Sequence, residues 1–272
     1  MKVIKESKIY QNGAAASFID KKLAKGFVSF SLKELLQESG LSVVAARKQL
    51  LRLGTTVVRV TPRQQYFLIV TPDQLNFGAP PAEWWLGDYF KWLGHPYYLA
   101  LQSAAAVYGS SQQAIQETQV ITDMPRRDIS LGRIRIRFFM KSGIGKTITR
   151  QLPNARAPLL VSTPESTVFD LVRYAHNIGG MERVAETIRP IVAQMKTNNL
   201  LKMLHSEGEI ATAQRLGFIL ETIGADKFAK TVLQWLPRYI QNVPLSTYQA
   251  IEKSAPVNQT WSIFNNVGAF HD

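Results

Sequence analysis

The order of helix caps and turns in residues 14–70 constrains the fold of this chain more than any other feature. Ser31 is followed three residues later by Glu34, a capping-box pattern that predicts the first turn of a helix. Ser42 is a second N-cap candidate, and Gly54 predicts the end of the helix that starts there. Two short helices joined by a tight turn are therefore predicted near the start of the chain.

A helix at 14–25 is predicted before this pair, and a hairpin after it. The β-branched and aromatic runs 57–61 and 66–70 are separated by the loop 62–65, which is the pattern of two paired strands. Helix, helix, turn, helix and hairpin is the order of a winged helix-turn-helix, a fold that places its last helix in the major groove of DNA. Residues 1–80 are predicted to form such a domain.

The remaining residues, 81–272, follow a linker at 72–85 with three prolines and a glycine. Apolar patterns there predict strands at 119–122, 133–140 and 159–161 and helices at 97–108 and 164–176. Further helices are predicted near 181–195, 197–206, 209–222, 225–236 and 246–253. The predicted fold class is therefore α+β: an N-terminal winged helix-turn-helix, then a domain over 81–272 with a small sheet and a helical C-terminal tail from about residue 177.

The chain has a formal net charge of +12, and the excess is confined to its first 160 residues. Residues 1–80 carry 12 basic and 5 acidic side chains, and residues 81–160 carry 10 and 5. Residues 161–272 carry 10 of each. Because residues 1–160 are basic and residues 161–272 are neutral, we predict that the first 160 residues bind a polyanion.

The helix predicted at 42–53 has two different faces when it is plotted at 100° per residue. One face is apolar and is predicted to pack on the preceding helices through Val43, Ala46, Leu50 and Leu53. The other presents small and basic residues that suit base edges and phosphates, and the hairpin adds further positive charge. The predicted DNA-contacting residues are Ser42, Val44, Ala45, Arg47, Lys48, Arg52, Arg59, Arg63 and Gln64.

A second basic surface is predicted around the strand at 133–140. Because side chains alternate along a strand, three arginines would line one face and Ile134, Ile136 and Phe138 the core face. This surface would extend a nucleic-acid footprint, or it would be an ordinary solvated sheet face; the residues themselves leave both open. Its members are Arg126, Arg127, Arg133, Arg135, Arg137 and Lys141.

Several kinds of chemistry are excluded or disfavoured. The absence of cysteine excludes disulfides and thiolate sites, and the four histidines lack metal-ligand spacing, so no metal or cofactor is predicted. The segment 143–147 ends in the Gly-Lys-Thr of a phosphate loop, but Met140 stands where the full pattern needs glycine. No signal peptide or membrane-spanning run is visible, so a cytoplasmic protein that is not an enzyme is expected.

The chain resembles the AbiEi family, the antitoxins of type IV toxin–antitoxin (abortive infection) systems. The resemblance rests on the predicted winged helix and on the strand predicted at 133–140, called the arginine strand below. It rests further on the segments Tyr97–Gly109, Gln119–Thr122 and Ser162–Leu171. It implies repression of the protein's own operon through inverted repeats in the promoter. It also implies neutralisation of a nucleotidyltransferase toxin without a stable complex between the two proteins.

Two other functions remain open on the residues alone. The chain could be a stand-alone winged-helix regulator without a toxin partner, or its winged helix could be a protein-docking module. An apolar outer helix face would favour docking; Lys48, Arg52 and Arg63 favour DNA.

Overall fold

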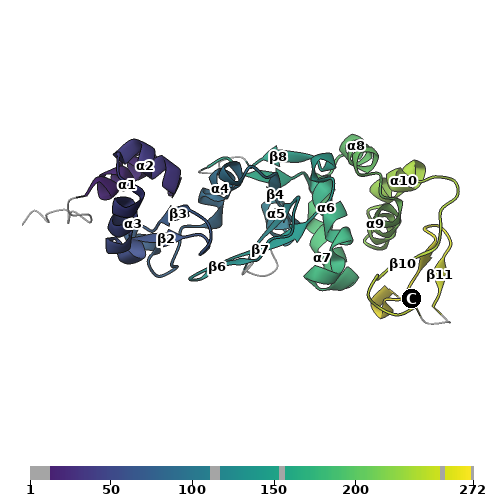
Figure 1. Ribbon diagram of the computed structural model, residues 1–272. Coiled ribbons are helices and arrows are strands. Elements are labelled where there is room, and N and C mark those ends of the chain that lie inside the picture. Colours follow the sequence, from purple (N-terminus) through teal and green to yellow (C-terminus); the bar gives the residue numbers. More distant parts are fainter. Residues whose placement is uncertain (1–12, 111–116, 153–156, 252–254, 271–272) are drawn as a thin grey trace, which may run out of the picture. The chain divides into compact units, whose positions relative to one another are not determined.

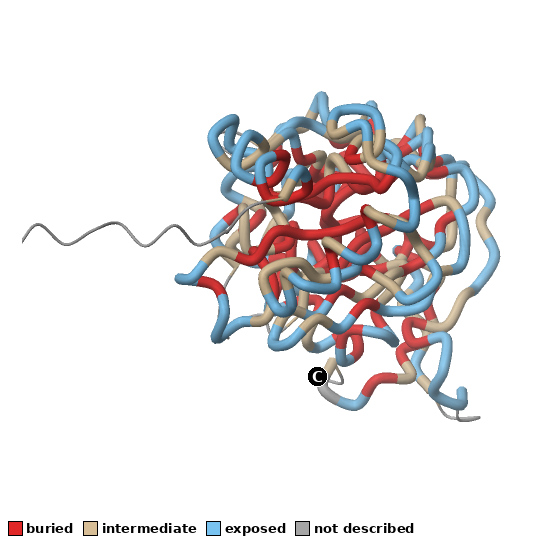
Figure 2. The backbone as a smooth tube through the Cα atoms, turned by 60° about the vertical axis from the view of Figure 1, so that its left-hand side comes forward, coloured by how far each residue is buried: buried red, intermediate tan, exposed pale blue. Residues whose placement is uncertain are grey.

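The structure is a computed structural model that describes residues 13–110, 117–152, 157–251 and 255–270 (Figure 1). The chain divides into two compact units: unit 1 comprises residues 1–95, 127–137 and 152–159, and unit 2 comprises residues 96–126, 138–151 and 160–272. Unit 1 thus continues past residue 80 and takes in two later segments. Each unit has its own core of buried residues. Figure 2 shows buried backbone segments in red, with exposed segments in pale blue toward the outside.

Unit 1 begins with three helices and a three-stranded sheet. In chain order these are α1 (Ala14–Ala24), β1 (Ser29–Ser31), α2 (Leu32–Ser39), α3 (Val43–Arg52), β2 (Val57–Arg59) and β3 (Tyr66–Ile69). The central strand β3 is antiparallel to both β1 and β2. The predicted capping box is present: the Ser31 amide donates to Glu34 Oε2 at 2.6 Å, and the Glu34 amide donates to Ser31 Oγ at 3.2 Å.

Aromatic rings fill the core between these helices and the sheet. The Phe30 ring lies 5.2 Å from the Phe18 ring and 5.4 Å from the Phe67 ring. Ala46 and Leu50 are the buried residues of α3, as the helical plot predicts. The prediction that Val43 packs beside them is wrong, because this first residue of α3 lies outside the core and is 42% exposed.

The rest of unit 1 contains α4 (Leu86–Leu93), β6 (Ile129–Leu131) and the first half of β7 (Ile134–Met140). The turn between β6 and β7 lies against the backbone of Phe77, whose carbonyl oxygen accepts a hydrogen bond from the Arg133 amide at 2.8 Å. A Cβ at Gly132 would overlap that oxygen, so only glycine fits there. This contact places the arginine strand's first half in the same unit as α3.

Unit 2 is built on a sheet in which β7 continues. The other strands are β4 (Tyr97–Leu99), β5 (Thr118–Thr122), β8 (Thr149–Gln151) and β9 (Leu160–Ser162), in the order β6-β7-β5-β4-β9-β8. The predicted helix at 97–108 is wrong at its start, because residues 97–99 form a strand and α5 (Leu101–Val107) begins later. Two tyrosines favour extended backbone, and β4 is buried between β5 and β9.

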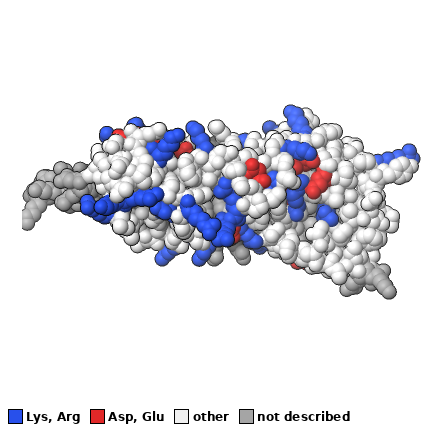
Figure 3. Space-filling view, viewed as in Figure 1, with Lys and Arg blue, Asp and Glu red and all other residues white. Residues whose placement is uncertain are grey.

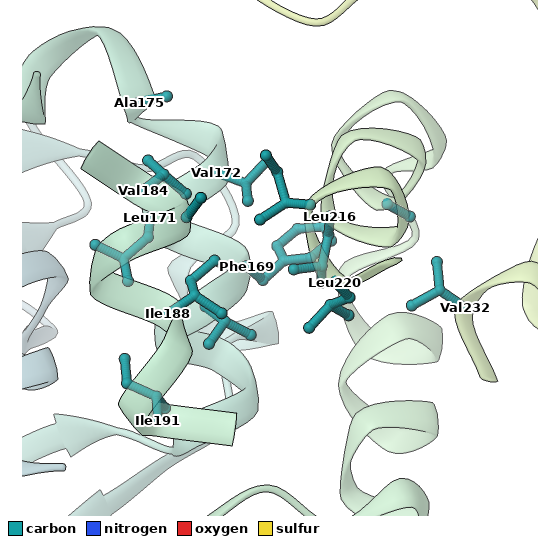
Figure 4. Packing of buried hydrophobic residues seen from close by; sticks show 14 of the residues in the cluster. Phe169, Leu171, Val172, Ala175, Val184, Ile188, Ile191, Leu216, Leu220 and Val232 are labelled. Atoms are coloured by element: carbon teal, nitrogen blue, oxygen red, sulfur yellow. The ribbon is translucent and has the colours of Figure 1, made fainter. Parts of the chain in front are cut away.

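Five longer helices complete the core of unit 2: α6 (Pro164–Arg173), α7 (Gly180–Ile191), α8 (Thr197–Glu207), α9 (Ile210–Thr222) and α10 (Asp226–Trp235). Figure 4 shows Phe169 and Val172 of α6 directed toward Leu216 and Leu220 of α9. All five helices lie close to their predicted ranges. Within the described ranges, no helix combines the length and the apolar character that crossing a membrane requires.

The C-terminal segment packs back as β10 (Val243–Pro244), β11 (Val257–Asn258) and β12 (Ile263–Phe264). The predicted helix at 246–253 is wrong over 246–251, which is not helical; residues 252 and 253 lie outside the described residues. The Asn266 side chain explains the difference. Its side-chain amide nitrogen donates to the carbonyls of Ser246 and Gln249 at 2.9 Å, and its side-chain oxygen accepts from the Ser246 amide. These backbone groups therefore bond to a side chain instead of to one another in a helix.

Candidate nucleic-acid interface

The orientation of α3 is determined by its buried face. Ala46 and Leu50 enter the core, and the Ala15 amide of α1 donates to Gln49 Oε1 at 2.9 Å. The predicted cap is also present, since the Ala45 amide donates to Ser42 Oγ at 3.3 Å. The opposite face of α3 therefore points to solvent, and Ala45 at its edge is half-buried.

The outer face of α3 is basic at its margins and apolar at its centre. Arg47, Lys48 and Arg52 are exposed, and no described residue forms an ion pair with them. Val44 is 65% exposed and Leu51 is 83% exposed. The sequence interpretation placed Val44 on this face but did not consider Leu51. A basic surface that leaves its cations without acidic partners suits a polyanion.

The loop between β2 and β3 is hydrogen-bonded to α4 on one side. Gln64 Oε1 accepts hydrogen bonds from Thr61 Oγ1 at 2.9 Å and from the Tyr89 hydroxyl of α4 at 2.7 Å. Arg59 is exposed, donates to the Pro62 carbonyl at 3.0 Å, and lies over the Phe67 ring. Arg63 at the tip is exposed as well. The two arginines are thus available to a ligand, while the Gln64 side-chain oxygen already has partners.

The arginine strand keeps the predicted alternation only in part. Arg133 and Arg135 are exposed, Arg137 is half-buried, and Ile136 is buried on the opposite face. The prediction that Phe138 faces the core is wrong: Phe139 is the buried residue, because the burial period changes where β7 passes from unit 1 to unit 2. Figure 3 shows lysine and arginine side chains gathered over α3 and over the β6–β7 hairpin.

Two neighbours of this strand in the sequence differ in exposure. Arg127 is exposed and belongs to unit 1, whereas Arg126 is half-buried and belongs to unit 2. The structure therefore groups four of the five predicted arginines with α3: Arg127, Arg133, Arg135 and Arg137.

Lys141, predicted as part of the basic surface, is instead buried in unit 2, with its side chain 1% exposed. Its ammonium donates to Asp170 Oδ1 at 2.9 Å, Glu207 Oε1 at 2.7 Å and Thr147 Oγ1 at 2.6 Å. An ammonium has three protons to donate, and these three acceptors account for all of them. The correction follows from tertiary structure, because both carboxylates come from distant helices, α6 and α8.

Further hydrogen bonds complete this buried ionic cluster of Lys141, Asp170, Glu207, Thr147 and Tyr98. The Tyr98 hydroxyl donates to Asp170 Oδ2 at 2.7 Å, and Thr147 Oγ1 donates to Glu207 Oε1 at 2.9 Å. Burial raises the pKa of the Asp170 carboxyl, and the neighbouring ammonium opposes that shift. The cluster links β4, the end of β7, α6 and α8, so its role is to hold these elements together.

The cluster accounts for the threonine of the Gly-Lys-Thr sequence. Thr147 is buried and bonded within the cluster, while Lys146 is exposed. The residues that follow form the strand β8, whereas a phosphate loop leads into a helix. Among the described residues, no group of three or more His, Cys, Asp or Glu side chains is arranged to hold a metal ion. The sequence interpretation missed Asp170 and Glu207 because nothing local marks them as partners of Lys141.

A protein-family model matches one part of the chain. The family model described as the AbiEi antitoxin C-terminal domain matches residues 98–222, which include the whole buried ionic cluster. No protein of curated function matches the sequence.

The fold resembles that of a solved structure. The crystal structure of the RV2827C protein from Mycobacterium tuberculosis aligns with a TM-score of 0.66 and 15% identity, covering 96% of this chain and 94% of that one. The crystal structure of an antigenic nucleotidyltransferase-like protein from Paracoccidioides brasiliensis has a TM-score of 0.35 and 8% identity, covering 60% of this chain and 94% of that one.

Proposed function

Because residues 98–222 belong to the AbiEi antitoxin family, we propose that this protein is the antitoxin of a type IV toxin–antitoxin system and the repressor of its own promoter. In this role it acts in the cytoplasm and counteracts a nucleotidyltransferase toxin without forming a stable complex with it. The family match is the observation that carries the antitoxin role. The repressor role rests on unit 1.

The N-terminal part of unit 1 supports a winged helix-turn-helix. Its element order is helix, strand, helix, helix and hairpin, and its sheet order is β1-β3-β2. The last helix, α3, presents exposed cations outward, and the β2–β3 loop presents Arg63. Helices of this kind read base edges in the major groove while a neighbouring wing contacts phosphates. We therefore assign DNA binding to α3 and the β2–β3 loop.

A double substitution tests whether repression and protection are separate tasks. Lys48→Ala with Arg52→Ala is expected to weaken promoter binding by about 1–3 kcal/mol for each side chain that contacts a base. The family-matched segment is untouched, so the variant should still protect cells that express the toxin. Gel-shift titration on the protein's own promoter and growth with the toxin are the two measurements.

The matched control is Lys21→Ala with Lys33→Ala, which removes the same charge from exposed positions on α1 and α2. The control should bind the promoter much more tightly than the Lys48/Arg52 variant. Equal binding by both variants would contradict a specific role for α3. Loss of protection in the Lys48/Arg52 variant would show that DNA binding and protection are one task.

A second prediction concerns the arginine strand, which we propose contacts phosphates beside the α3 site. Arg133→Ser with Arg135→Ser should weaken binding alike on all DNA sequences. It should lower the slope of log affinity against log salt by about one unit for each arginine that neutralises a phosphate. Lys227→Ser with Lys230→Ser, exposed on α10 of unit 2, is the charge-matched control. An unchanged slope in the arginine variant would mean that this strand is an ordinary solvated sheet face.

A further inference from the structure

The centre of the outer face of α3 is apolar, although the face as a whole is basic. Val44 and Leu51 are separated by seven residues, so they lie within about 20° of each other around the helix axis. Arg47 lies on one side of the line that joins Val44 and Leu51 along the helix, and Lys48 and Arg52 lie on the other. The two apolar side chains therefore form a ridge with cations on both flanks.

Nothing in the fold of the described residues requires this ridge. Val44 is 65% exposed and Leu51 is 83% exposed, so neither contributes to the core. Valine also favours a helix less than alanine or lysine does, because its branched Cβ restricts the side chain. The exposed side chain of Val44 is therefore available for contact with a ligand.

We propose that Val44 contacts the 5-methyl group of a thymine in the promoter, so that α3 reads an A·T pair between the positions that its cations contact. This inference rests on the proposed DNA-binding function and names the base that it recognises. The thymine methyl is the apolar group that the major groove presents, and small apolar side chains are its usual partners.

The position of Val44 along α3 singles it out from Leu51. Val44 is the second residue of α3, and the N-terminal residues of a recognition helix are those that contact base edges. Leu51 lies seven residues further on, about 10 Å along the axis, near the end of the helix. Lys48 and Arg47, one turn after Val44, are placed to contact guanine or phosphate on either side of the thymine.

The experiment uses the full-length protein and its own promoter, with each thymine of the bound half-site replaced in turn by deoxyuridine. This replacement removes only the methyl group. At one thymine per half-site, wild-type protein should bind about fourfold more weakly, which is the effect of removing one buried methyl. Val44→Ala should bind the natural promoter more weakly and should be insensitive to deoxyuridine at that position.

Val43→Ala is the matched control, because it truncates the adjacent, exposed valine at a position about 100° around the helix. It should keep the wild-type sensitivity to deoxyuridine. The proposal is overturned if no deoxyuridine weakens wild-type binding, or if Val44→Ala remains sensitive. Promoter binding by Val44→Ala equal to that of wild type would also overturn it, and would favour a protein partner for the ridge. Failure of wild-type protein to prefer its promoter over unrelated DNA would instead reject the proposed repressor function.

Discussion

Replacing Lys141 by alanine is expected to lower the free energy of unfolding by about 3–5 kcal/mol, which is the usual cost of leaving buried charges without their partner. Asp170 and Glu207 have side chains that are 0% and 2% exposed, so both charges are shielded from bulk water, and Glu207 would keep only its 3.4 Å contact with Arg173 as an ion pair among the described residues. Folded domains are stable by only about 5–15 kcal/mol, so the loss is large. Urea unfolding followed by circular dichroism measures it.

Lys146→Ala is the control for this substitution. Lys146 lies five residues away and is exposed, so its removal should change the stability by less than about 0.5 kcal/mol. A destabilisation below about 1 kcal/mol for Lys141→Ala would contradict the assignment of the buried cluster as a structural link. Because the cluster lies within the family-matched segment, Lys141→Ala should also reduce protection against the toxin, whereas Lys146→Ala should not.

Replacing Trp261 by alanine is expected to cost about 3–5 kcal/mol of stability, the usual range for removing a buried tryptophan. Trp261 is 1% exposed, and its indole N–H donates to Glu221 at 2.7 Å. The ring fills the space beside Gly217 of α9, where a Cβ would overlap it. The C-terminal segment would therefore be held less firmly against α9, which urea unfolding should detect.

The opposite substitution, Gly217→Ala, tests the same packing from the other side. It should overpack the interface and cost about 1–3 kcal/mol. In the double variant the new methyl can occupy space that the ring has left, so the combined destabilisation should be smaller than the sum of the two single effects. Additive effects would show that Gly217 and Trp261 do not act on one another. Trp235→Ala, on half-buried Trp235, should cost less than Trp261→Ala.

Much of the fold follows from local signals in the sequence. The caps at Ser31 and Ser42 start the two helices that they predict, and the hairpin strands lie where β-branched and aromatic residues gather. The helices of residues 180–235 follow their apolar periodicity. These features depend on neighbours within about one helical turn, or on a strand's immediate partner, and such neighbours can be read directly from the order of residues.

The same reasoning predicted the two faces of α3, because burial of Ala46 and Leu50 determines which residues point outward. The same plot places Leu51 beside Val44, but only the folded chain decides whether another element covers them, and it leaves Val44 65% and Leu51 83% exposed. For Arg133 and Arg135, alternation along the strand was sufficient.

Tertiary structure decided the features whose partners lie far away in the sequence. Residues 97–99 become a strand because β5 and β9 supply hydrogen bonds on both sides, and residues 246–251 are not helical because Asn266 binds their backbone. Lys141 follows a strand that carries exposed arginines, yet it is buried because Asp170 and Glu207 meet it from two other helices. A charge is buried only where such partners compensate for the water it gives up, and their convergence is a property of the folded chain.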